Sequence, residues 1–229
     1  MKKFISALLA IVLMTLTAGA RPYALNLSNF SALKVVDGIN VIHKCQPDSA
    51  GWVCFDGDEN IAPKILFSNV KNQLKIELAD DGEPIGHLPV VHVYSLSLEK
   101  AENSGDSTLT VITPTPCSQI KFRVVGNGTI KAGGLHATTV EGKIDTGRGQ
   151  IFLDGKAQTV KLSNTGTGRI DAQNLEAEVG NCKMLGTGPI YCTVNSELIV
   201  TGIGSGTVYV KGYPKTIKNR TIGVKIVQE

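Results

Sequence analysis

The residues of this chain that could carry out chemistry are acids, histidines and cysteines, and their spacing matches no catalytic pattern. An enzyme that cuts an acidic polysaccharide needs carboxylates gathered on one flank, or a base beside a cation. Asp145, Asp154 and Asp171 instead occupy three different positions relative to the repeating glycines described below. The four histidines lack metal-ligand spacing, and the chain contains no Gly-x-Ser-x-Gly elbow. We therefore expect no enzyme activity, metal or cofactor, and keep a polysaccharide lyase or hydrolase as an alternative.

Three aromatic residues share one position of the repeat and are the candidate ligand-facing residues. Phe152, Tyr191 and Tyr209 each follow the second glycine of a pair by three residues, where the strand is expected to face outward. Exposed aromatic side chains in a column can bind sugars or a partner protein, and they can equally cover the sheet under a long loop. A glycan or a cell-surface protein is the partner that this column favours.

The cysteines favour one local disulfide. Cys45 and Cys54 lie nine residues apart across a turn-rich segment between two extended runs, which suits a disulfide across a hairpin. Cys182 and Cys192 fall at inward positions of the repeat and are interpreted as small buried residues. The pairing of Cys117, Cys182 and Cys192 stays open, because spacing alone does not fix connectivity.

A repeat that runs from Val125 to Val210 contains the three aspartates, the three aromatic residues, Cys182 and Cys192, and it must position them. A Gly-x-Gly pair occurs five times, and successive second glycines are 21, 19, 20 and 18 residues apart. A period of about twenty residues is typical of a solenoid. The apolar residues two positions after the second glycines are Ile130, Ile151, Ile170, Ile190 and Val208.

The positions around each glycine pair predict one coil made of two strands. Residues two and four positions after the second glycine share the inward face of a strand. Another strand precedes each pair. In one coil the charged residues Glu141 and Lys143 stand at its inward positions, while the neighbouring Val140 and Ile144 are apolar. This pattern indicates a shift of one residue, with a bulge or a longer corner in that coil. Glycine suits the corner because a tight turn needs a positive φ. Since stacked coils bury what one coil cannot, we predict an all-β, right-handed parallel β-helix with coils of about 18–21 residues.

The chain begins with the features of a secretory signal peptide. Lys2 and Lys3 precede an uncharged apolar run, and residues 18–20 form a small-x-small cleavage site. The alternative is a membrane anchor, but the run is shorter than the ~20 residues that cross a bilayer. We predict a signal peptide over residues 1–20, a β-helix domain over 21–214 and a C-terminal strand or cap over 215–229.

Export and charge narrow the classes of function. The whole sequence has 23 basic and 20 acidic residues, and removing Lys2 and Lys3 with the signal peptide leaves a net charge of +1. Nothing indicates a nucleic-acid partner, which needs a clustered basic face. No later run is apolar and long enough to span a membrane. We expect an exported protein of the periplasm or the cell surface.

Several segments resemble a known family. Residues 33–43 read LKVVDGINVIH, residues 71–76 read KNQLKI, and residues 204–214 read GSGTVYVKGYP. Together with the glycine repeat, they resemble the auto-transporter adhesin, head GIN domain family over roughly residues 27 to 214, and Gly38-Ile39-Asn40 matches the triplet in its name. The resemblance implies a bacterial, exported, right-handed β-helix with no assigned catalytic residues. The preferred function is therefore a non-enzymatic adhesin or envelope binding module, ahead of a polysaccharide-active enzyme and of a purely structural envelope protein.

Overall fold

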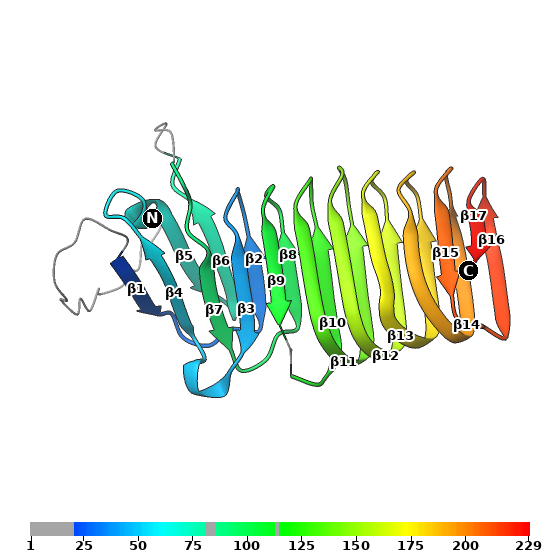
Figure 1. Cartoon of the computed structure of the whole chain (residues 1–229), viewed down its shortest axis with the longest axis horizontal. Helices are drawn as coiled ribbons and strands as arrows, with labels where there is room; N and C mark the ends of the chain where they lie inside the picture. The colour runs from blue at the N-terminus through cyan, green and yellow to red at the C-terminus, as the bar shows by residue number, and fades with distance from the viewer. Residues whose placement is uncertain (1–20, 81–85, 113–114) are drawn as a thin grey trace.

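The computed structural model describes residues 21–80, 86–112 and 115–229, so the predicted signal peptide lies outside the described residues. The described residues are 65% strand and 3% helix and form a β-solenoid of about six turns. Figure 1 shows the coils stacked along one long axis, from the N-terminal strands to the red C-terminal coil. The predicted fold class is confirmed.

The described residues form seventeen strands and two short 3-10 helices. The strands are β1 (Arg21–Asn26), β2 (Ala32–Val35), β3 (Val41–Cys45), β4 (Trp52–Gly57), β5 (Ile65–Val70), β6 (Gln73–Leu78), β7 (Val91–Ser95), β8 (Lys100–Asn103), β9 (Thr108–Ile112), β10 (Cys117–Val124), β11 (Thr129–Ile144), β12 (Gln150–Asn164), β13 (Arg169–Met184), β14 (Ile190–Ile203), β15 (Thr207–Lys211), β16 (Thr216–Ile222) and β17 (Lys225–Gln228). The 3-10 helices are η1 (Pro47–Ser49) and η2 (Ala62–Lys64).

The coils present two outer surfaces, because each long strand bends and contributes its two halves to different sides. We call one side the charged sheet: it contains β6, β2, β8, β10, the second halves of β11 to β14, and β16. We call the other side the aromatic sheet: it contains β7, β3, β9, the first halves of β11 to β14, β15 and β17. All of these neighbouring strands pair in parallel, as stacked copies of one coil should.

The first coil in the sequence is not at the end of the stack. Strand β2 pairs with β6 on one side and β8 on the other, and β3 lies in the same way between β7 and β9 (Figure 1). The chain therefore forms β2 and β3, builds the end of the stack with β4 to β7, and then crosses back over the first coil. The crossing is fixed by hydrogen bonds from Leu96 N to Asn29 Oδ1 (2.9 Å) and from Glu99 N to Ser31 O (2.7 Å).

The predicted inward columns form the core. Ile130, Ile151, Ile170, Ile190 and Val208 all have 0% exposure. In the misfitting coil the buried residues are Val140 and Ile144, as the one-residue shift requires, while Glu141 and Lys143 face outward. That strand stays in register with its neighbours there, so the extra residue lies in the corner between Ile144 and Gly147 rather than in a bulge.

The corner glycines are needed mainly for close stacking, which corrects the expectation that at least one residue of each tight corner takes a positive φ. Among the corner pairs only Gly126 (φ 101°) and Gly147 (φ 79°) do so. At Gly188 an added Cβ would lie 1.8 Å from the carbonyl oxygen of Gly168 in the neighbouring coil. A side chain there would push adjacent coils apart.

The two ends of the stack are built differently. At the N-terminal end β5 pairs with β6, β4 with β7, and β1 with β4, all antiparallel. At the C-terminal end β16 and β17 form one more coil, turned at Gly223 with a φ of 81°. There Asn219 is aligned with Val200, and Gln228 with Val210, so polar residues replace apolar ones in the inward columns. Polar inward residues end the apolar core, as in the terminal repeats of other solenoids.

Candidate functional site

The aromatic sheet carries the three candidate aromatic residues in one outward column. The strand register aligns Phe152 with Asp171, Asp171 with Tyr191, and Tyr191 with Tyr209. The rings of Tyr191 and Tyr209 stack with centroids 4.6 Å apart and planes 8° apart. Phe152 is separated from this pair by Asp171, so the column has two parts.

Arg169 extends the tyrosine stack. Its guanidinium lies 4.2 Å from the centroid of the Tyr191 ring, and it donates a hydrogen bond to Asp171 Oδ2. Since Arg169 comes from β13 and Tyr209 from β15, the two faces of the Tyr191 ring are both covered. A ligand would therefore meet the edge and hydroxyl of Tyr191 rather than its face.

Arg169 also keeps one unused hydrogen-bond donor. Its Nε atom is buried and has no hydrogen-bond partner among the described residues. Buried donors without a partner are uncommon in folded proteins, because leaving one unsatisfied costs about 1–3 kcal/mol.

A hollow of about 390 Å³ lies beside Phe152 on the same sheet. Gly133 lines it, and no atom lies within 4 Å of the position that a Cβ on Gly133 would take, so a missing side chain opens the hollow. Pockets with an apolar wall and a few placed polar groups are typical of small-molecule and sugar sites. The other outward-facing lining residues are Thr110, Ile112, Lys131, Phe152, Asp154, Asp171, Gln173 and Asn174.

Two of the acids considered as catalytic residues line this hollow. Asp154 is aligned with Asn174, and Asp171 with Phe152, so they belong to different columns as the sequence predicted. Asp145 lies on the charged sheet, away from both. Asp171 is held by Arg169 and by the backbone N–H of Gln173 at 3.2 Å.

The predicted Cys45–Cys54 disulfide is absent, since all five cysteines are free thiols. Strand β7 lies between the two residues: Cys45 is aligned with Ser95 of β7, and Cys54 with His92 of the same strand. Two strands separated by a third are about 10 Å apart, whereas a disulfide requires Cα atoms within about 7 Å. The prediction was wrong because β3 and β4 do not pair with each other.

The other cysteines are placed as follows. Cys182 and Cys192 are buried, as interpreted, and a hydrogen bond between their side chains, together with burial, raises the pKa of Cys182. Burial, and then the nearby Cys45, raise the pKa of Cys117. Cys45 thus has Cys117 nearby, from a segment 72 residues away along the chain.

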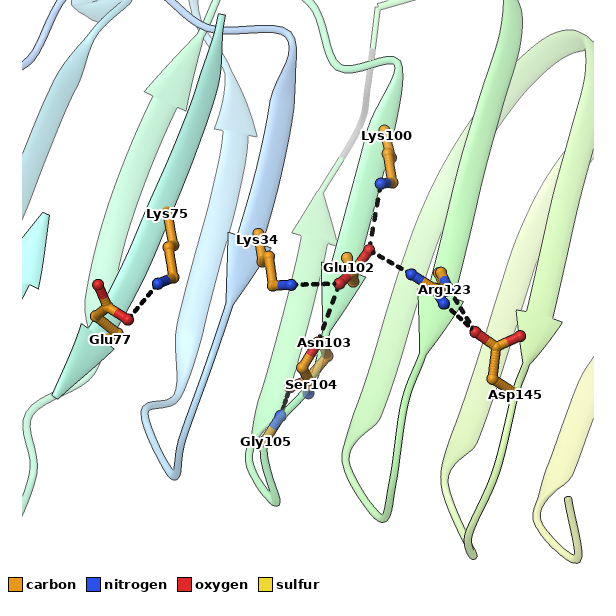
Figure 2. Close-up of polar contacts among 10 residues, drawn as sticks. All are labelled: Lys34, Lys75, Glu77, Lys100, Glu102, Asn103, Ser104, Gly105, Arg123 and Asp145. Atoms are coloured by element: carbon orange, nitrogen blue, oxygen red, sulfur yellow. Dashed lines mark hydrogen bonds and ion pairs between the residues drawn. The ribbon is translucent and has the colours of Figure 1, made fainter. Parts of the chain in front are cut away.

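An ion-pair ladder crosses the charged sheet (Figure 2). Glu102 has 3% exposure and contacts Lys34 Nζ at 2.9 Å, Lys100 Nζ at 3.2 Å and Arg123 Nη1 at 3.1 Å. Burial alone would raise the pKa of Glu102, but the hydrogen bonds and charges of Lys34 and Lys100 lower it to about 2. Since Lys34 is on β2, the ladder ties the out-of-order coil to β8 and β10.

The ladder continues to Asp145, which directly follows β11. Arg123 Nε donates to Asp145 Oδ2 at 2.6 Å, and Lys143 Nζ lies 2.7 Å from Asp145 Oδ1. These cations lower the pKa of Asp145 against the opposing effect of its burial. This ladder is not visible in the sequence, because its members become neighbours only through strand pairing.

A buried histidine was also missed. His43 has 0% exposure, and burial lowers its pKa to about 4. Its Nε2 lies 2.8 Å from Ser95 Oγ, and the Ser95 hydroxyl donates to Ser97 O, which makes Nε2 the donor in the pair. Nδ1 has no partner among the described residues. His43 occupies an inward column, so its role is in packing rather than in ligand binding.

The described ranges contain neither a metal-type cluster nor a membrane-type helix. Over 21–80, 86–112 and 115–229, no three His, Cys, Asp or Glu side chains gather where they could hold a metal ion. Over the same residues, no helix is long and apolar enough to cross a bilayer.

Comparison with solved structures identifies relatives of the same fold. A "putative adhesin" from Bacteroides fragilis NCTC 9343 superposes with a TM-score of 0.82 at 18% identity, over 93% of this chain and 97% of that one. A "putative adhesin" from Parabacteroides merdae ATCC 43184 gives 0.68 at 19% identity, with coverage of 93% and 97%. A "Putative lipid binding protein" from Parabacteroides distasonis ATCC 8503 gives 0.69 at 15% identity, with the same coverage.

Functionally curated proteins give no match to the chain. The family model described as "Putative auto-transporter adhesin, head GIN domain" matches residues 29–214, which include the candidate site and all but the last strand of each sheet. The resemblance seen in the sequence is thereby confirmed, and the chain belongs to this family.

Proposed function

We propose that this protein is an exported, non-enzymatic binding module of the cell envelope that recognises glycans through the aromatic sheet. The observation that carries the proposal is the hollow beside Phe152, whose lining residue Asp171 is hydrogen-bonded to Arg169 of the Arg169–Tyr191–Tyr209 stack. Membership in an adhesin family supports a binding role at the cell surface.

The chemistry of the hollow suits a sugar ring. Phe152 offers an apolar surface, while Asp154, Gln173 and Asn174 offer donors and acceptors for hydroxyl groups. The strands beneath pair in parallel up to Ala132, Phe152 and Asp171, and register shifts follow between Ala132 and Leu135 and between Phe152 and Asp154. The polar groups of the hollow therefore lie where the stacked strands bend from one sheet into the other.

Binding inside the solenoid is not favoured. The inward columns are filled by buried apolar side chains along the described length of the stack. A ligand therefore has the outer surface available to it, and we place the site there.

Glycan binding is tested with the purified mature chain on an array of neutral and charged glycans, and on intact cells. Replacing Phe152, Tyr191 and Tyr209 with serine should abolish binding, because it removes the apolar wall and the tyrosine edge. Tyr213→Ser is the matched control, since Tyr213 is 85% exposed and lies outside the column. Unchanged binding by the triple variant, or equal loss in the control, would overturn the proposal.

Export and location need a separate test. The apolar run and the cleavage site at residues 18–20 support removal of a signal peptide. Cell fractionation should recover a chain that starts at Arg21, and an antibody applied to intact cells should label it if it reaches the surface. A cytoplasmic chain that retains residues 1–20 would contradict export.

A further inference from the structure

The charged sheet gathers cations that are far apart in the sequence. From β2 to β16, its two central outward columns hold nine basic and two acidic side chains, although the formal net charge of the whole sequence is only +3. One column is Lys34, Glu102, Arg123, Lys143, Ser163, Lys183, Thr201 and Arg220. The other, two residues earlier on each strand, is Ala32, Lys100, Lys121, Glu141, Lys161, Asn181, Ile199 and Lys218.

Acids neutralise these columns unevenly. From β2 to β11, Lys34, Lys100, Arg123 and Lys143 form ion pairs with Glu102 or Asp145 in the ladder. Past β11 the compensation weakens: Lys161 lies 3.7 Å from Glu141, which also pairs with Lys121 at 3.5 Å. The ammonium group of Lys183 makes no ion pair or hydrogen bond within the described part of the chain. Positive charge is thus in excess around β12 and β13.

A hollow of about 260 Å³ lies at this place. Three lysines and one carboxylate, Lys143, Lys161, Lys183 and Glu141, line it, together with Ser163 and Asn181. Lys143 and Lys183 lie two strands apart on either side of Ser163, which puts their Cα atoms about 10 Å from each other. The short serine side chain leaves room between the lysines for an acidic group.

We propose that this hollow, and the columns that lead into it, bind a linear acidic polysaccharide lying along the axis of the solenoid. A cation is available at most strands, with neighbouring strands about 4.8 Å apart, so an extended polymer with regularly spaced acids meets several of them. Ser163, Asn181 and Thr201 offer hydrogen bonds to its hydroxyl groups. This surface is on the opposite sheet from the glycan site proposed above and does not depend on it.

The test measures binding of the mature chain to polygalacturonate, dextran sulfate and neutral dextran by affinity electrophoresis at two salt concentrations. The double variant Lys161→Gln, Lys183→Gln should weaken binding to the acidic polymers about tenfold, because each exposed ion pair contributes a factor of a few. Ser163→Glu, which places a carboxylate in the hollow and keeps every lysine, should weaken it as well. Raising the salt should weaken the wild-type interaction.

The matched control is Lys211→Gln, Lys225→Gln, which removes the same charge from exposed positions of the aromatic sheet. It should bind the acidic polymers as the wild type does, and so should the serine variant of the aromatic column. The preferred polymer identifies the acid group as carboxylate or sulfate. Failure of the wild type to bind either acidic polymer, equal loss in the lysine control, or equally tight binding of duplex DNA would overturn the proposal.

Discussion

A Cβ atom added to Gly168 would lie 1.9 Å from the carbonyl oxygen of Gly149 in the neighbouring coil. This contact explains why the repeat retains glycine at a corner where φ is not positive. The spacing between coils is set by backbone hydrogen bonds, so the corner has no freedom to move outward.

Gly168→Ala should therefore destabilise the protein by about 2–3 kcal/mol, the usual cost of forcing extra atoms into a packed position. Urea unfolding of the purified chain measures the change. Gly38→Ala is the control, because no atom lies within 4 Å of a Cβ at that position. Equal stability of the two variants would show that the corners do not restrict the stacking.

Glu102 should make the stability of the protein depend on acid pH. Its pKa in the folded protein is about 2, below its usual value of 4.5, so its ion pairs stabilise the fold above pH 4.5. That contribution is lost as the pH falls towards 2, because protonation removes the charge from the carboxylate. Unfolding free energies measured between pH 5 and pH 2, for the wild type and Glu102→Gln, should show a smaller slope in the variant.

Glu102→Gln should also cost about 2–4 kcal/mol at neutral pH, since it leaves Lys34, Lys100 and Arg123 without their common partner. Glu77→Gln is the control for the same sheet: it breaks one exposed pair with Lys75 (Figure 2) and should cost less than about 1 kcal/mol. Similar losses in the two variants would contradict a special role for the ladder.

His43 should add a second pH dependence, in a different window. Its folded pKa of about 4 lies below the value of 6.5 for an exposed histidine, because burial favours the neutral ring. Between these values the unfolded chain binds more protons, so stability falls as the pH drops from 6.5 to 4, by about 2 kcal/mol at pH 5. His43→Leu should remove this slope, and His136→Leu, at an exposed position, should keep it. A wild type equally stable at pH 7 and pH 5 would show that the buried ring takes up a proton freely.

Cys45 and Cys54 should not form a disulfide with each other in the folded protein. Peptide mapping of protein purified without reductant should find no Cys45–Cys54 bond, because β7 separates the two strands. Recovery of that linked peptide in natively folded protein would mean that β3 and β4 lie closer than the strand pairing places them.

The repeat made much of the fold predictable from sequence. The glycine spacing and the apolar residues after it identified the coils and the buried isoleucine column, because each coil places chemically equivalent residues in register. The corner geometry was explained incompletely: a single coil suggests a positive φ, and the contact between Gly168 and Gly149 exists only in the stack.

The N-terminal coils could not be predicted in this way. Nothing in the local sequence marks that β2 lies between β6 and β8, so the pairing of Lys34 with Glu102, 68 residues further along, was missed. The disulfide prediction was wrong for the same reason, because the local sequence does not show which strands are neighbours. The spacing of Cys45 and Cys54 suggested a hairpin that the chain does not form. The aromatic column was visible in the sequence, whereas the cover that Arg169 places on Tyr191 was not.

The measurement that tests the proposed glycan site most directly is the binding of Gly133→Met to the glycan selected by the array. This substitution fills the hollow beside Phe152 and meets no atom within 4 Å at its Cβ, so the melting temperature should be unchanged. Our account predicts that binding is lost in Gly133→Met and retained in Gly38→Met. Wild-type affinity in a folded Gly133→Met variant would contradict it.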